Sequence, residues 1–123
     1  MKQRYIPIVL ILLIFLLALH NLQYSPLPWF DEGWGLSLAR NWVEHGHYGH
    51  FLQGGPVSST ILNTGFPAIL PIASSFRVLG IGIWQGRLPS VFFLIGSCLL
   101  LYHLAQQLYG RKVAVCTLVA LLL

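Results

Sequence analysis

An apolar segment runs from Leu88 to Leu108 and is bounded by Arg87 and Arg111, and it constrains the fold more than any other feature. A helix over this range would be about 31 Å long, close to the roughly 30 Å hydrocarbon core of a bilayer. A basic residue at each end is typical of a membrane-spanning helix, because the charges sit among the headgroups. The segment therefore predicts a transmembrane helix over residues 88–108.

The composition of the whole chain also favours a membrane protein. Hydrophobic residues make up 56% of the 123 residues and charged residues only 8%, whereas soluble domains carry about 25% charged residues. The net charge of +4 comes from scattered basic residues that flank apolar runs, so no nucleic-acid binding is predicted. Cys98 and Cys116 both lie within apolar runs and are predicted to be small core residues, not a disulfide or a metal pair.

A second transmembrane helix is predicted over residues 6–22, directly after Lys2 and Arg4. A secretory signal peptide has the same opening, but no small-residue cleavage site follows the apolar run, which favours an uncleaved anchor. The two basic residues place the N-terminus in the cytoplasm, so the first loop lies outside the plasma (inner) membrane. Residues 113–123 begin a third apolar helix, and we expect the chain to be the truncated, N-terminal piece of a longer protein.

The loop over residues 23–87 is predicted to carry two amphipathic juxtamembrane helices. The first, over residues 31–45, starts with Asp31 as N-cap and has Trp34, Leu38 and Trp42 on one stripe, which is typical of a helix lying in the headgroups. Residues 47–63 form a loop rich in turn residues.

A second interfacial helix is predicted over residues 64–80. Pro67 and Pro71 and a short uncharged run make this segment a poor span, although the loop charges balance equally well if it crosses the membrane. The predicted fold class is thus an all-α integral membrane protein, with transmembrane helices and a large outer loop.

Asp31 and Glu32 are the candidate catalytic residues. They follow the first predicted span directly and lie among Trp29, Phe30 and Trp34. Partial desolvation in such a setting would raise the pKa of a carboxyl group and suit a general base that takes a proton from a hydroxyl. The alternative is structural: an N-cap and a first-turn charge on an interfacial helix.

Two further sets of side chains lie on the same predicted side of the membrane. Arg40, Arg77 and Arg87 are candidate ligands for a lipid phosphate, the alternative being ordinary anchoring among membrane lipid headgroups. The second set is the histidine cluster His45, His47 and His50, which could bind a divalent metal, although a flexible loop lacks the fixed scaffold of a typical site.

The order of these motifs resembles the start of a membrane glycosyltransferase of the GT-C class, of the protein-O-mannosyltransferase and aminoarabinose-transferase type. The motifs that carry the resemblance are Asp31-Glu32 with Leu38-Ala39-Arg40, Glu44-His45-Gly46-His47-Tyr48, Phe76-Arg77-Val78-Leu79-Gly80, Trp84-Gln85-Gly86-Arg87-Leu88-Pro89-Ser90 and Leu108-Tyr109-Gly110-Arg111-Lys112. The resemblance implies transfer of a sugar from a polyprenyl-phosphate carrier to an acceptor glycan, lipid or protein on the outer face. It also implies that Asp31 acts as base or orients the acceptor, with Glu32 as its neighbour.

The chain differs from this family where the donor phosphate is expected to bind. Many relatives carry Lys-Pro-Pro at the head of the second juxtamembrane helix, where this chain reads Asn63-Thr64-Gly65-Phe66-Pro67 and has no lysine. A piece of this length is expected to be inactive alone, and the only cofactor-like requirement implied is the lipid-linked sugar donor. The alternative function is a non-enzymatic membrane protein or transporter whose outer loop binds a partner or a metal.

Overall fold

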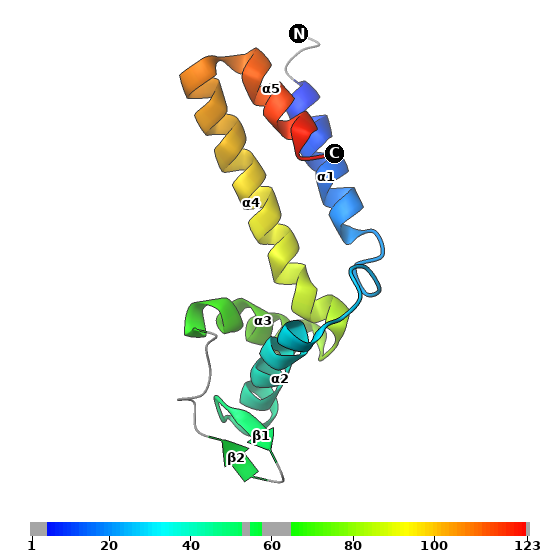
Figure 1. Ribbon diagram of the computed structural model, residues 1–123, viewed down its shortest axis with the longest axis vertical. Helices are drawn as coiled ribbons and strands as arrows, with labels where there is room; N and C mark the ends of the chain where they lie inside the picture. The colour runs from blue at the N-terminus through cyan, green and yellow to red at the C-terminus, as the bar shows by residue number, and fades with distance from the viewer. Residues whose placement is uncertain (1–4, 53–54, 58–64, 123) are drawn as a thin grey trace. The chain divides into compact units, whose positions relative to one another are not determined.

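The computed structural model describes residues 5–52, 55–57 and 65–122, and in these residues helix predominates (Figure 1). The elements, in chain order, are α1 (Ile6–Leu19), α2 (Phe30–His45), β1 (His50–Leu52), β2 (Gly55–Val57), α3 (Phe66–Leu79), α4 (Ile83–Tyr109) and α5 (Arg111–Ala120). They form two compact units, one of residues 22–89 and one of residues 1–21 with 90–123. The helical class agrees with the prediction, whereas the short strand pair is not predicted.

Helix α4 is, among the described residues, the one helix long and apolar enough to cross a membrane, judged by length and composition. It has 27 residues and begins at Ile83, five residues before the predicted start. Arg87 therefore lies inside the helix and not in front of it. Only 22% of the most apolar 18-residue stretch of α4 is buried within the chain, so most of its side chains face outward.

Helix α1 is shorter than the predicted range of residues 6–22. It ends at Leu19 after 14 residues, or about 21 Å. His20 takes an extended conformation and Asn21 a left-handed one with φ of 59°, which asparagine tolerates better than most residues. The polar exit from the apolar run thus ends the helix, and α1 is an apolar helix below the usual length of a span.

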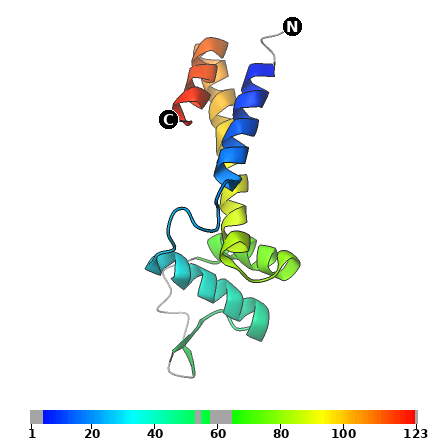
Figure 2. The same cartoon turned by 90° about the vertical axis from the view of Figure 1, so that its right-hand side faces the viewer.

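The unit formed by α1, α5 and the later part of α4 has a small apolar core. Ile14, Cys98 and Leu118, one from each helix, are buried there, and α1 and α5 lie side by side (Figure 2). Cys98 is fully buried, as predicted for a core residue, but Cys116 is exposed, so that prediction is wrong for Cys116. Cys116 lies on a different face of α5 from Leu118, because residues two apart point in different directions on a helix.

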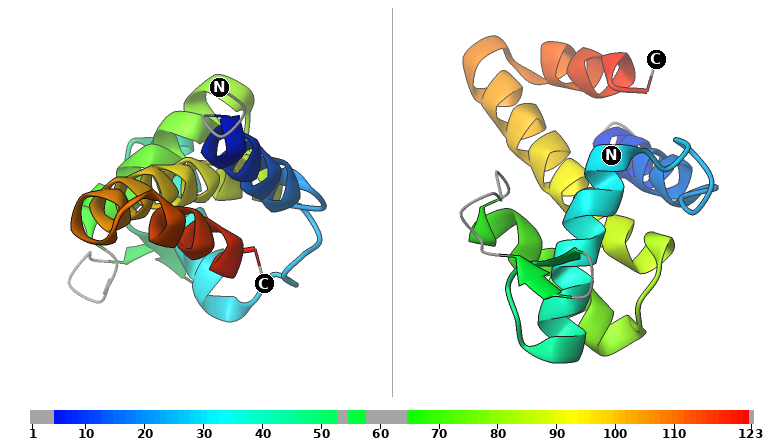
Figure 3. Two further views of the ribbon diagram at one scale, coloured as in Figure 1. Left: turned by 90° about the horizontal axis from the view of Figure 1, so that it is seen from above. Right: turned by 60° about the horizontal axis from the view of Figure 1, so that its bottom comes forward.

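In the unit of residues 22–89, α2 packs against α3 (Figure 3). The buried contacts are made by Leu38 and Ala39 from α2 and by Ile69, Ala73 and Phe76 from α3. Leu38 has no exposed surface, so the centre of the predicted interfacial stripe packs against α3 and is not available to headgroups. Helix α3 therefore covers the apolar face of α2.

The segment between α2 and α3 was predicted to be a loop, but part of it forms an antiparallel strand pair. His50 pairs with Val57 and Leu52 with Gly55. The two strands are three residues each, too short to show the alternating pattern by which a strand is recognised in a sequence. Helix α3 begins at Phe66, and the predicted start at residue 64 lies outside the described residues.

Candidate functional site

Glu32 and Arg87 form a two-point ion pair between the first turn of α2 and the start of α4. Nε of Arg87 donates to Oε1 of Glu32, and Nη2 donates to Oε2 at 2.6 Å. Nη1 of the same guanidinium donates to the carbonyl oxygen of Leu22 at 2.7 Å. Only 9% of the Arg87 side chain and 20% of the Glu32 side chain are exposed. One partly buried arginine thus ties together the segment before α2, α2 itself and α4.

This ion pair fixes the charge of Glu32. The hydrogen bonds from Arg87 hold the pKa of the Glu32 carboxyl below 4.5; burial opposes this, while the charge of Arg87 and the backbone of Trp29 add to it. The prediction of a raised pKa is therefore wrong for Glu32, because the hydrogen bonds from Arg87 outweigh the effect of desolvation. A carboxylate held in this way is a weak base, and its role is to anchor the start of α2.

Asp31, its neighbour, is placed quite differently. The N-cap of α2 is Trp29, so Asp31 lies inside the first turn and the predicted N-cap role is wrong. Its side chain is exposed, and within the described residues its carboxylate makes no hydrogen bond or ion pair. Because successive helical residues point about 100° apart, the two acidic side chains separate into a bound one and an open one.

The three candidate arginines also differ in whether they have a hydrogen-bond partner. Arg87 is committed to Glu32, and Arg40 donates from Nε to Oε2 of Glu44 at 2.9 Å on the surface of α2. Arg77 is exposed and, in the part of the chain that the structure describes, has no hydrogen bond or ion pair. It is therefore the candidate whose guanidinium is open to an anion.

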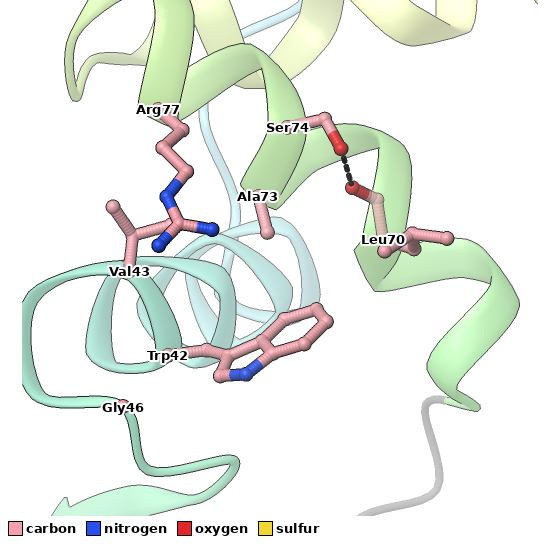
Figure 4. A pocket seen from close by; sticks show the side chains of 7 residues that line it. All are labelled: Trp42, Val43, Gly46, Leu70, Ala73, Ser74 and Arg77. Atoms are coloured by element: carbon pink, nitrogen blue, oxygen red, sulfur yellow. Dashed lines mark hydrogen bonds between the residues drawn. The ribbon is translucent and has the colours of Figure 1, made fainter.

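Arg77 lines a cavity of about 260 Å³ between α2 and α3. Figure 4 shows its guanidinium reaching from α3 toward the α2 side of the cavity, where Trp42 and Val43 stand. Leu70 and Ala73 provide further apolar wall. The cavity thus joins one cation to a largely apolar lining, which suits an amphiphilic anion.

His50 is the most buried of the candidate metal ligands, with 5% of its surface exposed. Its Nδ1 lies 2.9 Å from Oγ of Ser37, and its ring packs on the indole of Trp34 with the ring centres 3.9 Å apart. Burial lowers the pKa of His50 below 6.5, so the imidazole is neutral at pH 7. The strand β1 holds this ring against α2.

The other two histidines do not join His50 in a metal site. His45 is exposed at the end of α2, with Nε2 at 3.9 Å from the Glu44 carboxylate, and His47 is half-buried in the turn that follows. Within residues 5–52, 55–57 and 65–122, no three His, Cys, Asp or Glu side chains gather so as to hold a metal ion. The structure therefore gives the predicted metal site no support.

Around His50 lies a polar pocket of about 370 Å³ that sequence reasoning missed. Its lining residues are Trp34, Ser37, Arg40, Asn41, Glu44, His45 and His50. Nδ2 of Asn41 donates to the carbonyl oxygen of Gly49 at 3.0 Å, which helps to fold the turn after α2 back along the helix. The polar face of α2 is visible in the sequence, but the pocket exists only because His50 returns to that face.

No protein-family model matches this chain, and no curated protein or solved structure matches it either. The functional argument therefore rests on the chemistry of the side chains described above, together with the order of motifs in the sequence.

Proposed function

We propose that this chain supplies the acidic first loop of a membrane glycosyltransferase, which moves a sugar from a polyprenyl-phosphate carrier to an acceptor hydroxyl. Asp31 is the general base. It takes the proton of the acceptor hydroxyl while the hydroxyl oxygen bonds to the anomeric carbon of the sugar. The bond from that carbon to the phosphate oxygen breaks, and its electron pair leaves with the polyprenyl phosphate.

The observation that carries this proposal is the contrast between the two adjacent acids. Glu32 is bound by Arg87, whereas the Asp31 carboxylate is exposed and has no partner within the described residues. A base has to reach the proton it removes, and an open carboxylate can do so. The division of roles also accounts for why an acidic pair is useful here: one member anchors the helix and the other stays available.

Arg77 is the residue proposed to bind the donor phosphate. It supplies a cation where many relatives have a lysine ammonium, and its guanidinium matches the geometry of phosphate oxygens. The apolar wall beside it, with Trp42 and Leu70, suits the first part of a lipid chain. Arg87 is less suitable because it is largely buried against Glu32, and Arg40 because the carboxylate of Glu44 beside it would repel a phosphate.

The membrane setting is part of the same proposal. Helix α4 exposes large apolar side chains such as Phe92, Phe93 and Leu100, which are 61%, 63% and 73% exposed in the isolated chain. Lipid would cover such a surface. The basic residues Lys2 and Arg4 favour a cytoplasmic N-terminus and an outer location for the loop. Lys112→Cys should then resist an impermeant thiol reagent added outside intact cells, and efficient labelling would reverse the orientation.

Asp31→Asn in the full-length protein tests the catalytic role. Membranes receive polyprenyl-phosphate donors that carry a labelled hexose or pentose, and the label leaving the lipid carrier is measured. We expect a loss of about 100-fold or more, with normal expression, because a positioned base contributes about that much. Asp31→Glu keeps the carboxylate and should retain more activity than Asp31→Asn.

Two results would count against the proposal at different levels. Normal transfer by Asp31→Asn would remove the catalytic role of Asp31. Failure of the wild-type protein to use any of the donors would overturn the glycosyltransferase assignment and favour a non-enzymatic, partner-binding loop.

A further inference from the structure

The polar pocket beside β1 has a composition that selects for one kind of ligand. Arg40 and Glu44 on its rim are joined in an ion pair, so together they contribute no net charge. Ser37 and Asn41 add a hydroxyl and an amide, both neutral. A pocket whose charges cancel offers many hydrogen-bonding groups but little preference for an ion. Its volume of about 370 Å³ lies within the range of about 300–1,000 Å³ typical of small-molecule sites.

One residue that lines the pocket, His50, has an unmet hydrogen-bonding need. Within the described residues, Nε2 of His50 is buried and has no hydrogen-bond partner, while Nδ1 is engaged by Ser37. Leaving such a group unpaired is unfavourable, because it loses its hydrogen bond to water and gains none in return. A neutral imidazole presents either a donor or an acceptor at Nε2, and a hydroxyl group can serve both.

The rim can open at little cost. Arg40 and Glu44 are an exposed i, i+4 pair, with 59% and 33% of their side chains exposed. Exposed pairs of this kind contribute little to stability, because water screens their charges. The two side chains can therefore exchange their mutual contact for hydrogen bonds to a ligand, and a small shift of the wall would admit a hydroxyl to His50.

We infer that this pocket binds a neutral sugar of the acceptor, with Ser37 and His50 at its buried end and Arg40 and Glu44 at its rim. The inference rests on the proposed function and narrows the acceptor to a carbohydrate. Trp34, which lines the pocket, follows Asp31 by three residues on α2. Residues at this spacing are neighbours on a helix surface, so a sugar in the pocket lies close to the base.

Binding is tested on the purified full-length protein in detergent, without donor. Saturation-transfer NMR measures D-glucose, D-mannose, D-galactose and N-acetyl-D-glucosamine as probes, with inorganic phosphate as competitor. We expect at least one sugar to bind saturably, and Ser37→Ala and Glu44→Gln to weaken it about fivefold to tenfold each. The Ser37 hydroxyl also donates to the carbonyl oxygen of Trp34 at 2.9 Å. Thr117→Val is the matched control, because the Thr117 hydroxyl donates to a helix carbonyl in the same way but lies in α5. It should bind as the wild type does.

The sugar that binds should also accept label when it is added to the transfer assay. Absence of saturable binding by every sugar, unchanged affinity in both pocket variants, or displacement by phosphate would overturn the inference. Binding without labelling of the sugar would overturn its assignment as the acceptor. Sugar binding is measured without donor, so no transfer takes place in that experiment. A negative binding result would therefore overturn only the pocket assignment, whereas the transfer assay of Asp31→Asn tests the proposed function.

Discussion

Arg87 holds Glu32 by two parallel hydrogen bonds across 55 positions of sequence, and this contact joins the start of α4 to the first turn of α2. The same guanidinium binds the carbonyl oxygen of Leu22. A planar guanidinium suits this task because its donors diverge in a fixed plane toward two acceptors at once. The contact explains why one of two adjacent acids is structural.

Glu32→Gln should destabilise the protein, whereas Asp31→Asn should not. The amide of glutamine leaves a largely buried guanidinium without its counter-charge, which costs about 3 kcal/mol. Asp31 is exposed, so its change should alter stability by less than about 0.5 kcal/mol. Thermal unfolding in detergent measures both. Equal melting temperatures for the two variants would contradict the division of roles.

The contribution of Glu32 to the stability of the folded protein should disappear in acid. The pKa of Glu32 is lowered from 4.5 mainly by the hydrogen bonds from Arg87. A lowered pKa in the folded state means that the stabilisation is fully present above pH 4.5 and is lost as the pH falls through the folded value. The difference in melting temperature between wild type and Glu32→Gln should therefore narrow below that pH. A gap that stays constant down to about pH 3 would show that the ion pair is not its source.

His50 should make the protein less stable in mild acid. Burial lowers its pKa from 6.5, so the unfolded chain binds the proton more readily than the folded one. Stability then falls as the pH is lowered through 6.5 toward the folded value. Glu44, Arg40 and His45 line the same pocket, and burial is the cause of the lowered pKa of His50.

The variant His50→Gln should flatten the dependence of melting temperature on pH in this range. His20→Gln is the control, because His20 is exposed and lies just after α1. If the control flattens the curve as much as His50→Gln does, the effect does not come from burial.

Gly86→Ala should destabilise the contact of α4 with α2 and α3. A Cβ at this position would collide with Cδ2 of Leu36 and come within 3.3 Å of the Phe76 ring. Overpacking of this kind costs about 1–3 kcal/mol. Gly96→Ala in the same helix meets nothing within 4 Å and should instead stabilise by about 0.5–1 kcal/mol, because alanine is the better helix former. If Gly86→Ala and Gly96→Ala shift the melting temperature in the same direction, the close packing around Gly86 is contradicted.

Several elements could be predicted from local pattern alone. The stripe Trp34–Leu38–Trp42 predicts a helix, and α2 covers it from Phe30 to His45. The apolar run before Arg111 predicts a long helix, and α4 ends at Tyr109. The apolar stripe predicts α2, the length of the apolar run predicts α4, and a glycine marks the end of each helix. Gly46 and Gly110 both adopt positive φ, as glycines after a helix commonly do. The strand pair has no such pattern, so it was missed.

By itself, the sequence determined that this chain is rich in helix, that it contains one apolar segment long enough to cross a membrane, and that two of its three acidic residues lie at the start of one helix. Only the tertiary structure decided which acid is bound and which is open, because that depends on Arg87 arriving from 55 residues away. It also decided that His50 lies against Ser37 and not with the other histidines. Contacts between distant segments depend on how the chain folds back on itself, and no local pattern of residues encodes that geometry.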